Sequence, residues 1–119
     1  YVLVTQRKYE KLNIEQKTRF LYCQLFGILE AIHIPASLGW NTVQTDQMIC
    51  DKNDLFFFGE YKRVVSLFEK YFYGGEVLYD HDIAFIESYI NRFYLRMKNL
   101  TSKEKIKILH LRVKKKDYM

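Results

Sequence analysis

The chain has 119 residues, of which 49% are hydrophobic and 28% charged; this composition excludes a disordered protein and fits one globular domain, residues 1–119. Polar or charged residues interrupt every apolar stretch, so we expect no membrane-spanning helix. The net charge of +5 is confined to residues 100–119, where seven basic residues outnumber two acidic ones, while residues 1–99 are neutral. This asymmetry favours an acidic binding partner over a buried reaction centre.

The first predicted helix covers residues 14–34. Asn13 is a suitable N-cap, Gln16 completes a capping box three residues later, and Pro35 disfavours helical geometry at Ile34. The apolar side chains between these signals recur at helical spacing: Ile14, Leu21, Leu25, Ile28, Leu29 and Ile32. This pattern indicates an amphipathic helix with a wide apolar face.

The segments on either side of this helix are less regular. Residues 1–5 are rich in β-prone side chains and fit either an edge strand or a frayed lead-in. Residues 36–54 have the composition of a loop, in which residues 42–50 favour one short helix.

The second half of the chain predicts two more amphipathic helices, over residues 60–73 and 81–98. Gly74 and Gly75 supply a left-handed stop for the earlier helix, and Asp80 or Asp82 can cap the later one. The apolar stripe of the earlier helix consists of Tyr61, Val64, Val65, Phe68, Tyr71 and Phe72. That of the later helix consists of Ile83, Ile86, Ile90, Phe93 and Met97.

A fourth, basic helix is expected over residues 102–116, because Thr101 and Glu104 have the spacing of a capping box. The alternation of Lys and Ile over residues 105–108 fits a strand as well. We therefore predict a mainly α fold, a helical bundle of three to four amphipathic helices with a basic C-terminal helix or tail. The alternative is an α+β fold in which residues 76–80 and 106–113 pair as a winged-helix-like hairpin.

The residue patterns do not favour catalysis. Cys23 and His33 lie on the first predicted helix about 15 Å apart, which is too far for a hydrogen bond. The sequence does not exclude Cys50 beside His81 or His110, but any chain with two cysteines and three histidines offers such pairs.

Metal and cofactor sites are not expected either. The Asp80 to Asp82 run, with a histidine between two acids, is more typical of a helix cap than of a metal site, since adjacent side chains diverge there. Two widely spaced cysteines do not form a disulfide framework and indicate a reducing, intracellular compartment. We expect a non-enzymatic protein without metal or cofactor.

The basic segment is the strongest functional signal. It predicts a small nucleic-acid-associated regulator or a subunit of a nucleoprotein complex, in which basic side chains neutralise phosphates. An acidic protein surface is the other partner that this charge fits. The predicted contact residues are Arg92, Arg96, Lys103, Lys105, Lys107, Arg112, Lys114, Lys115 and Lys116.

Aromatic residues support an alternative function. They make up 17% of the chain, and thirteen of them lie between Phe56 and Tyr94. Most are expected in the core, but exposed Tyr and Phe also form recognition surfaces. The alternative is a protein-protein interaction module, acting as an adaptor, an assembly subunit or an inhibitor of a host factor, that uses helix grooves and exposed aromatic side chains.

Overall fold

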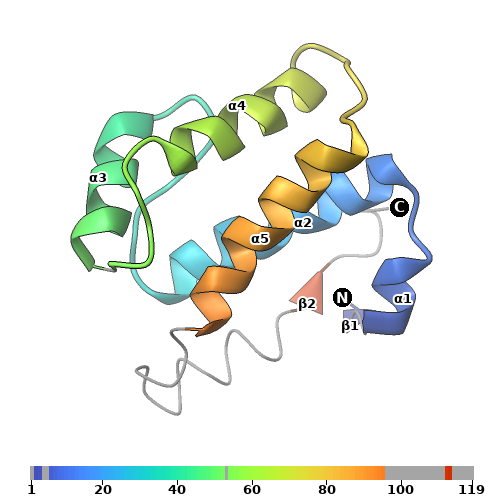
Figure 1. Cartoon of the computed structure of the whole chain (residues 1–119), viewed down its shortest axis with the longest axis horizontal. Helices are drawn as coiled ribbons and strands as arrows, with labels where there is room; N and C mark the ends of the chain where they lie inside the picture. The colour runs from blue at the N-terminus through green and yellow to red at the C-terminus, as the bar shows by residue number, and fades with distance from the viewer. Residues whose placement is uncertain (1, 4–5, 53, 96–111, 114–119) are drawn as a thin grey trace.

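The computed structural model describes the backbone of residues 2–3, 6–52, 54–95 and 112–113, and the side chains of residues 8–52 and 54–94. This part of the chain is mainly helical, as predicted (Figure 1). Its elements are β1 (Val2–Leu3), α1 (Gln6–Glu10), α2 (Ile14–Ala31), α3 (Thr42–Lys52), α4 (Glu60–Phe72), α5 (Asp80–Leu95) and β2 (Arg112–Val113).

The start of α2 confirms the predicted capping box. The Asn13 side chain accepts a hydrogen bond from the Gln16 backbone N–H at 2.8 Å, and the Gln16 side chain accepts one from the Asn13 N–H at 3.0 Å. The end of α2 differs from the prediction, because the helix stops at Ala31 rather than at residue 34. His33 adopts a left-handed φ of 63°, and the Ile34 N–H then bonds back to the Leu29 carbonyl at 2.9 Å. The chain therefore leaves the helix before Pro35 can end it.

Both predicted boundaries of α4 and the predicted start of α5 hold to within one residue, while the predicted end of α5 at residue 98 lies outside the described residues. Gly75, with a φ of 66°, lets the Glu76 N–H reach the Lys70 carbonyl at 3.2 Å, which ends α4 as expected. At the start of α5, the Asp82 carboxylate accepts a hydrogen bond from the Tyr79 N–H at 3.0 Å. Asp82 therefore satisfies a backbone donor that the helix itself leaves unpaired.

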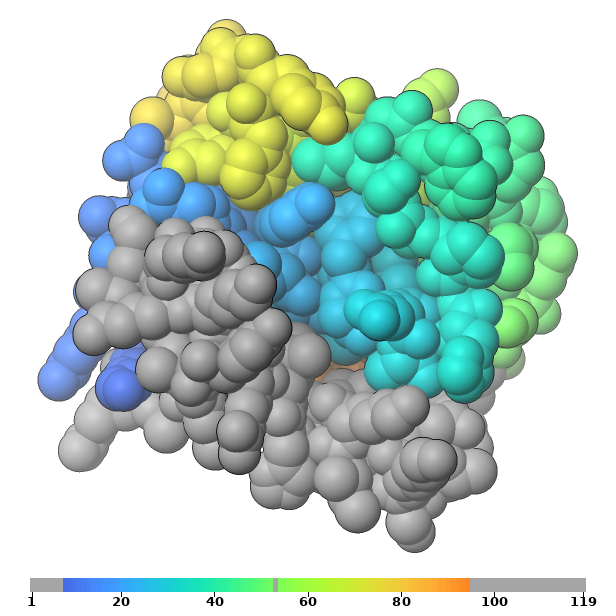
Figure 2. Space-filling model, turned by 180° about the vertical axis from the view of Figure 1, so that it is seen from behind, coloured from blue at the N-terminus to red at the C-terminus, as the bar shows by residue number. Residues whose placement is uncertain are grey.

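The core is formed where α2, α4 and α5 meet. Figure 1 shows α5 crossing α2, with α4 antiparallel to α5 at its side and α3 packed against α4. From the opposite side, Figure 2 shows α2 at the surface between the connection from α4 to α5 on one side and α3, with the connection that precedes it, on the other. The largest fully buried side chains come from these helices and the connections between them, among them Tyr61, Tyr89, Phe68, Leu25, Ile28, Ile86 and Ile90.

The C-terminal prediction is only partly tested and is wrong at one point. Arg112–Val113 forms a strand rather than part of a helix over residues 102–116. It pairs antiparallel with Val2–Leu3, so that Val113 lies opposite Val2. The β-prone N-terminal residues are thus the partner, and not residues 76–80 as the hairpin alternative supposed. The remainder of residues 102–116 lies outside the described residues.

Candidate protein-interaction site

The connection between α3 and α4 exposes two adjacent phenyl rings. Phe57 is 72% exposed and Phe58 is 59% exposed, although both lie in a connection that is hydrogen-bonded to the body of the protein. We call these two residues the Phe57–Phe58 tip. Exposing large apolar side chains to water costs free energy, so a pair of them on a fixed loop is a candidate contact surface.

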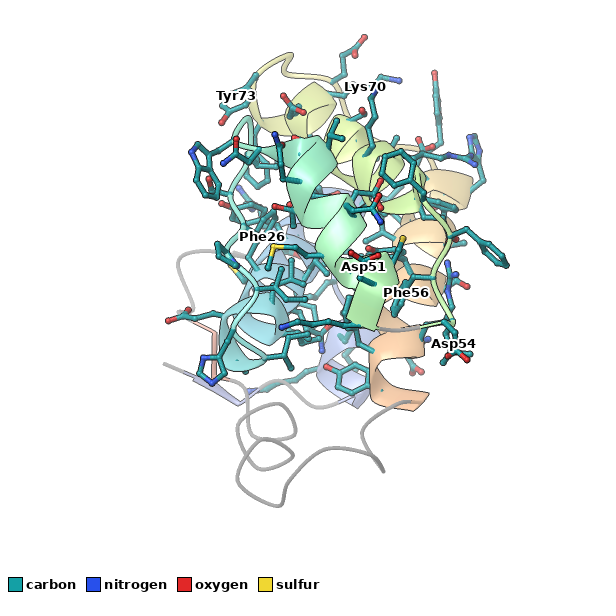
Figure 3. All side chains as sticks on the ribbon, turned by 90° about the vertical axis from the view of Figure 1, so that its left-hand side faces the viewer. Phe26, Asp51, Asp54, Phe56, Lys70 and Tyr73 are labelled. Carbon is teal, nitrogen blue, oxygen red and sulfur yellow. The ribbon has the colours of Figure 1, made fainter. Side chains whose placement is uncertain are left out.

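Phe56, immediately before the tip, anchors the connection in the core. Its side chain is only 4% exposed, and its ring centroid lies 5.0 Å from that of Tyr89 and 4.4 Å from that of Phe93. Figure 3 shows Phe56 beside α5, while Asp54 on the same connection lies at the edge of the molecule. Truncating such an anchor to Ala costs about 3–5 kcal/mol in protein cores, so the position of the tip is well determined.

Arg92 on α5 fixes the connection from one side. Its guanidinium forms a bidentate ion pair with the Glu60 carboxylate and donates a further hydrogen bond to the Leu55 carbonyl at 3.1 Å. It also lies 5.2 Å from the ring centroid of Phe56 and 5.5 Å from that of Tyr89. Planar Arg suits this site because the same group binds a carboxylate and stacks on rings.

Glu60 connects Arg92 to the backbone of the tip. Its Oε1 accepts a hydrogen bond from the Phe57 backbone N–H at 2.7 Å. Burial raises the pKa of Glu60, but the hydrogen bonds from Arg92 and from the Phe57 N–H, together with the Arg92 charge, lower it by more, so the net pKa lies below its ordinary value. The Arg92 pKa is raised by the same hydrogen bond. Glu60 is therefore ionised at neutral pH and holds both partners.

Asp46 on α3 fixes the connection from the other side. Its side chain is 1% exposed, and its Oδ2 accepts a hydrogen bond from the Gly59 N–H at 2.7 Å. Gly59 has a φ of 102°, which glycine adopts without strain, and this turn directs the chain from the tip into α4. Two carboxylates and one guanidinium from three helices thus hold the backbone on both sides of the tip.

Asp46 lies close to a cysteine thiol and to two buried tyrosines. The Cys50 thiol donates a weak hydrogen bond to Asp46 at 3.7 Å, and its pKa is raised by burial and by the nearby Asp46 charge. Burial also raises the pKa values of Tyr61 and Tyr89, whose hydroxyls have no hydrogen-bond partner in the described part of the chain. A thiol with a raised pKa is a weaker nucleophile at neutral pH, because less of it is thiolate.

Apart from the tip, the described part of the chain has a concave surface along the C-terminal half of α2. It is a wide groove of about 760 Å³ that Phe26, Glu30, His33 and Pro35 help to line. The lining mixes apolar side chains with one acid and one imidazole, which favours no single class of ligand. Across the described residues, no group of three His, Cys, Asp or Glu side chains is placed to hold a metal ion.

Of the predicted phosphate contacts, Arg92 alone has a described side chain, and it is already paired with Glu60. Arg112 lies in β2, with its side chain outside the described residues. The remaining predicted contacts, Arg96, Lys103, Lys105, Lys107, Lys114, Lys115 and Lys116, also lie outside the described residues. No helix in the described part of the chain is long and apolar enough to cross a membrane.

Sequence analysis did not single out the Phe57–Phe58 tip. A local signal exists, since three consecutive Phe residues precede Gly59 just before a helical pattern begins. That signal does not tell which of the three rings is buried, because the answer depends on Tyr89 and Phe93 more than thirty residues later.

Comparison of the chain with protein-family models, curated proteins and solved structures gave no match.

Proposed function

We propose that this protein is a protein-interaction module that binds its partner through the Phe57–Phe58 tip. The observation that carries the proposal is the contrast within one connection, in which Phe56 is buried and the next two rings are exposed. Covering the exposed parts of two phenyl rings removes roughly 200–300 Å² from water, a gain of about 5–7 kcal/mol before the costs of association.

The fixed backbone adds to this gain. A free loop loses conformational entropy when it binds, and this loss subtracts from affinity. Arg92, Glu60 and Asp46 already restrict the backbone on both sides of the tip. The proposed partner therefore meets a pre-organised pair of aromatic side chains, the kind of residue that dominates many interfaces.

A binding role also agrees with the chemistry of Cys50, one of the two free cysteines in the described part of the chain. Its raised pKa keeps the thiol protonated near neutral pH, and the Asp46 carboxylate to which it donates a weak hydrogen bond already accepts one from the Gly59 backbone. Nucleic-acid binding through residues 100–119 is a second proposal, supported by the confinement of the whole net charge to that segment.

The test of the tip is a pull-down with the double variant Phe57→Ala/Phe58→Ala. We expect it to lose the captured proteins while its free energy of unfolding stays within about 0.5 kcal/mol of wild type, because exposed side chains contribute little to stability. The matched control is Val43→Ala/Val77→Ala, which truncates two apolar residues that are each 53% exposed elsewhere on the surface.

Two further treatments distinguish binding by the tip from nucleic-acid binding. Nuclease treatment and physiological salt should leave capture by the tip intact, whereas phosphate binding weakens steeply with salt. Capture that survives the double variant, or that the valine control removes equally, would contradict a role for the tip. Phe56→Ala should instead lower stability by about 3–5 kcal/mol, as expected for a buried ring.

A further inference from the structure

The solvent-facing side of α4 is positively charged. Lys62, Arg63 and Lys70 are exposed and lie on one side of the helix together with Ser66, since their positions fall within about a third of a turn at 100° per residue. We call these four residues the α4 outer face. Its opposite side carries the buried residues Tyr61, Val64, Val65 and Phe68.

These positive charges are not neutralised within the described part of the chain. None of the three basic residues is in an ion pair there: the Arg63 guanidinium lies 4.2 Å from the Phe85 ring centroid, and the Lys70 ammonium lies 5.8 Å from that of Tyr79. Of the two acids on this helix, Glu60 is bound by Arg92, and half-buried Glu69 forms no ion pair within the described residues. The α4 outer face therefore presents cations to whatever approaches it.

Exposed aromatic side chains lie at both ends of this charged face. The Phe57–Phe58 tip directly precedes α4, and Tyr73, which is 70% exposed, directly follows it. The 13 residues of α4 extend over about 20 Å. Figure 3 shows Lys70 and Tyr73 at one end of the molecule, with Asp54 and Phe56 toward the other.

We propose that the partner is an acidic peptide segment with apolar side chains, which lies along the α4 outer face and packs its apolar residues against the Phe57–Phe58 tip. This inference rests on the proposed protein-interaction function and names the chemistry of the partner. Carboxylates of the segment pair with Lys62, Arg63 and Lys70, and such charge complementarity gives specificity and a faster encounter.

The distribution of acidic side chains favours a peptide over a nucleic acid. Exposed Asp51 and Asp54 lie close in sequence to the tip, and exposed Glu76 and Asp80 lie just beyond the other end of α4. A nucleic acid carries a charge at every phosphate and would meet these carboxylates as it leaves the face. A segment of about 12 residues with acids at its centre and apolar residues at its ends avoids that repulsion.

The experiment is a selection from a phage library of random peptides about 12 residues long, a length that spans α4 as a helix. The whole chain serves as the bait in four forms: wild type, Lys62→Gln/Lys70→Gln, Phe57→Ala/Phe58→Ala, and the matched control Lys11→Gln/Lys52→Gln. We expect wild type and control to enrich peptides with about twice the library content of Asp and Glu, together with two or more apolar residues.

The neutralised α4 variant should lose the acidic excess but keep the apolar one, and a selected peptide should bind it about 10-fold more weakly than wild type. Circular dichroism confirms that each variant is folded. If wild type enriches apolar peptides with no acidic excess, the inference is wrong while the proposed function of the tip stands. If no apolar enrichment occurs, or if it survives Phe57→Ala/Phe58→Ala, both fail.

The last part of the experiment measures the binding of a single-stranded RNA oligonucleotide by fluorescence anisotropy. We expect wild type to bind it more weakly than the selected acidic peptide, with no dependence on Lys62 and Lys70. Tighter binding of RNA than of peptide, abolished in the neutralised α4 variant, would make this face a nucleic-acid surface and overturn the inference.

Discussion

Arg92 illustrates how a residue's role depends on contacts that are distant in sequence. Arg96 follows it four residues later in the sequence, so Arg92 resembles part of a basic patch, and the sequence accordingly predicts a phosphate contact. In the structure its guanidinium pairs with Glu60, 32 residues earlier, and bonds to the Leu55 carbonyl. Both partners come close only after α4 and α5 have packed against each other, so no local pattern reveals them.

The pair formed by Glu60 and Arg92 makes stability depend on pH in a defined direction. The Glu60 pKa in the folded protein lies below its ordinary value of 4.5, so its contribution to stability is fully present above about pH 4.5. That contribution is lost as the pH falls through the lower, folded-state pKa, because protonation then removes the charge that Arg92 binds. Arg92 itself stays charged throughout this range.

We expect Glu60→Gln to destabilise the protein by about 1–2 kcal/mol at pH 7, since it weakens a hydrogen-bonded charge pair that is partly exposed. The difference from wild type should stay constant down to about pH 5 and shrink below pH 4.5. Urea unfolding followed by circular dichroism at several pH values measures it. A difference that is unchanged between pH 7 and pH 3 would show that the charge of Glu60 does not contribute.

At the scale of the helices, the sequence predicts the positions of α2, α4 and α5 because their signals are local. The Asn13 and Gln16 capping box, the glycines after α4 and the apolar stripes each act within one or two turns. The end of α2 was placed too late, since the left-handed turn at His33 has no signature that distinguishes it from one more helical residue.

A core substitution on α5 tests whether its predicted apolar side is buried. Ile90 lies at the middle of its apolar stripe and is only 1% exposed. Ile90→Ala should therefore cost about 2–5 kcal/mol, the transfer free energy of the removed methyl groups plus that of the cavity left behind. Chemical denaturation provides the measurement. A loss below about 0.5 kcal/mol would mean that this face of α5 is not in the core.

The candidate site could not be predicted in the same way. Its components are a buried ring from the connection, an acid from α3, an acid from α4 and a guanidinium from α5. Apart from the hydrogen bond between Glu60 and Phe57, which spans three residues, each contact joins residues whose separation in sequence says nothing about their distance in space. The three consecutive phenylalanines were visible in the sequence, but their division into one anchor and two exposed rings follows from tertiary packing alone.

At the scale of the whole molecule, the confinement of the net charge to residues 100–119 supports the second proposal, nucleic-acid binding through this basic segment. Reversing Lys114, Lys115 and Lys116 to Glu should weaken binding to duplex DNA or single-stranded RNA and leave helical content nearly unchanged. The slope of log affinity against log salt should fall by about 0.7–0.9 for each phosphate that the protein no longer neutralises. Fluorescence anisotropy with a polyglutamate control measures the affinity and its salt dependence.

The same reversal separates the two proposed binding surfaces. Capture through the Phe57–Phe58 tip should not respond to it, because none of the residues shown to hold the tip lies beyond Phe93. Equal binding of acidic ligands by wild type and the reversed variant would remove the basic segment as a contact element. The tip and the α4 outer face would then remain as the proposed binding surface.

The residues that anchor the connection are different from those that expose their rings, so the two sets can be substituted independently. Phe56, Asp46, Glu60 and Arg92 hold the connection in place, whereas the largely exposed side chains at positions 57 and 58 contribute little to its stability. Selection can therefore replace the two exposed residues without refolding the domain, so that binding preference evolves independently of stability. In the laboratory, the same two positions are where a library of variants would sample new recognition on an unchanged scaffold.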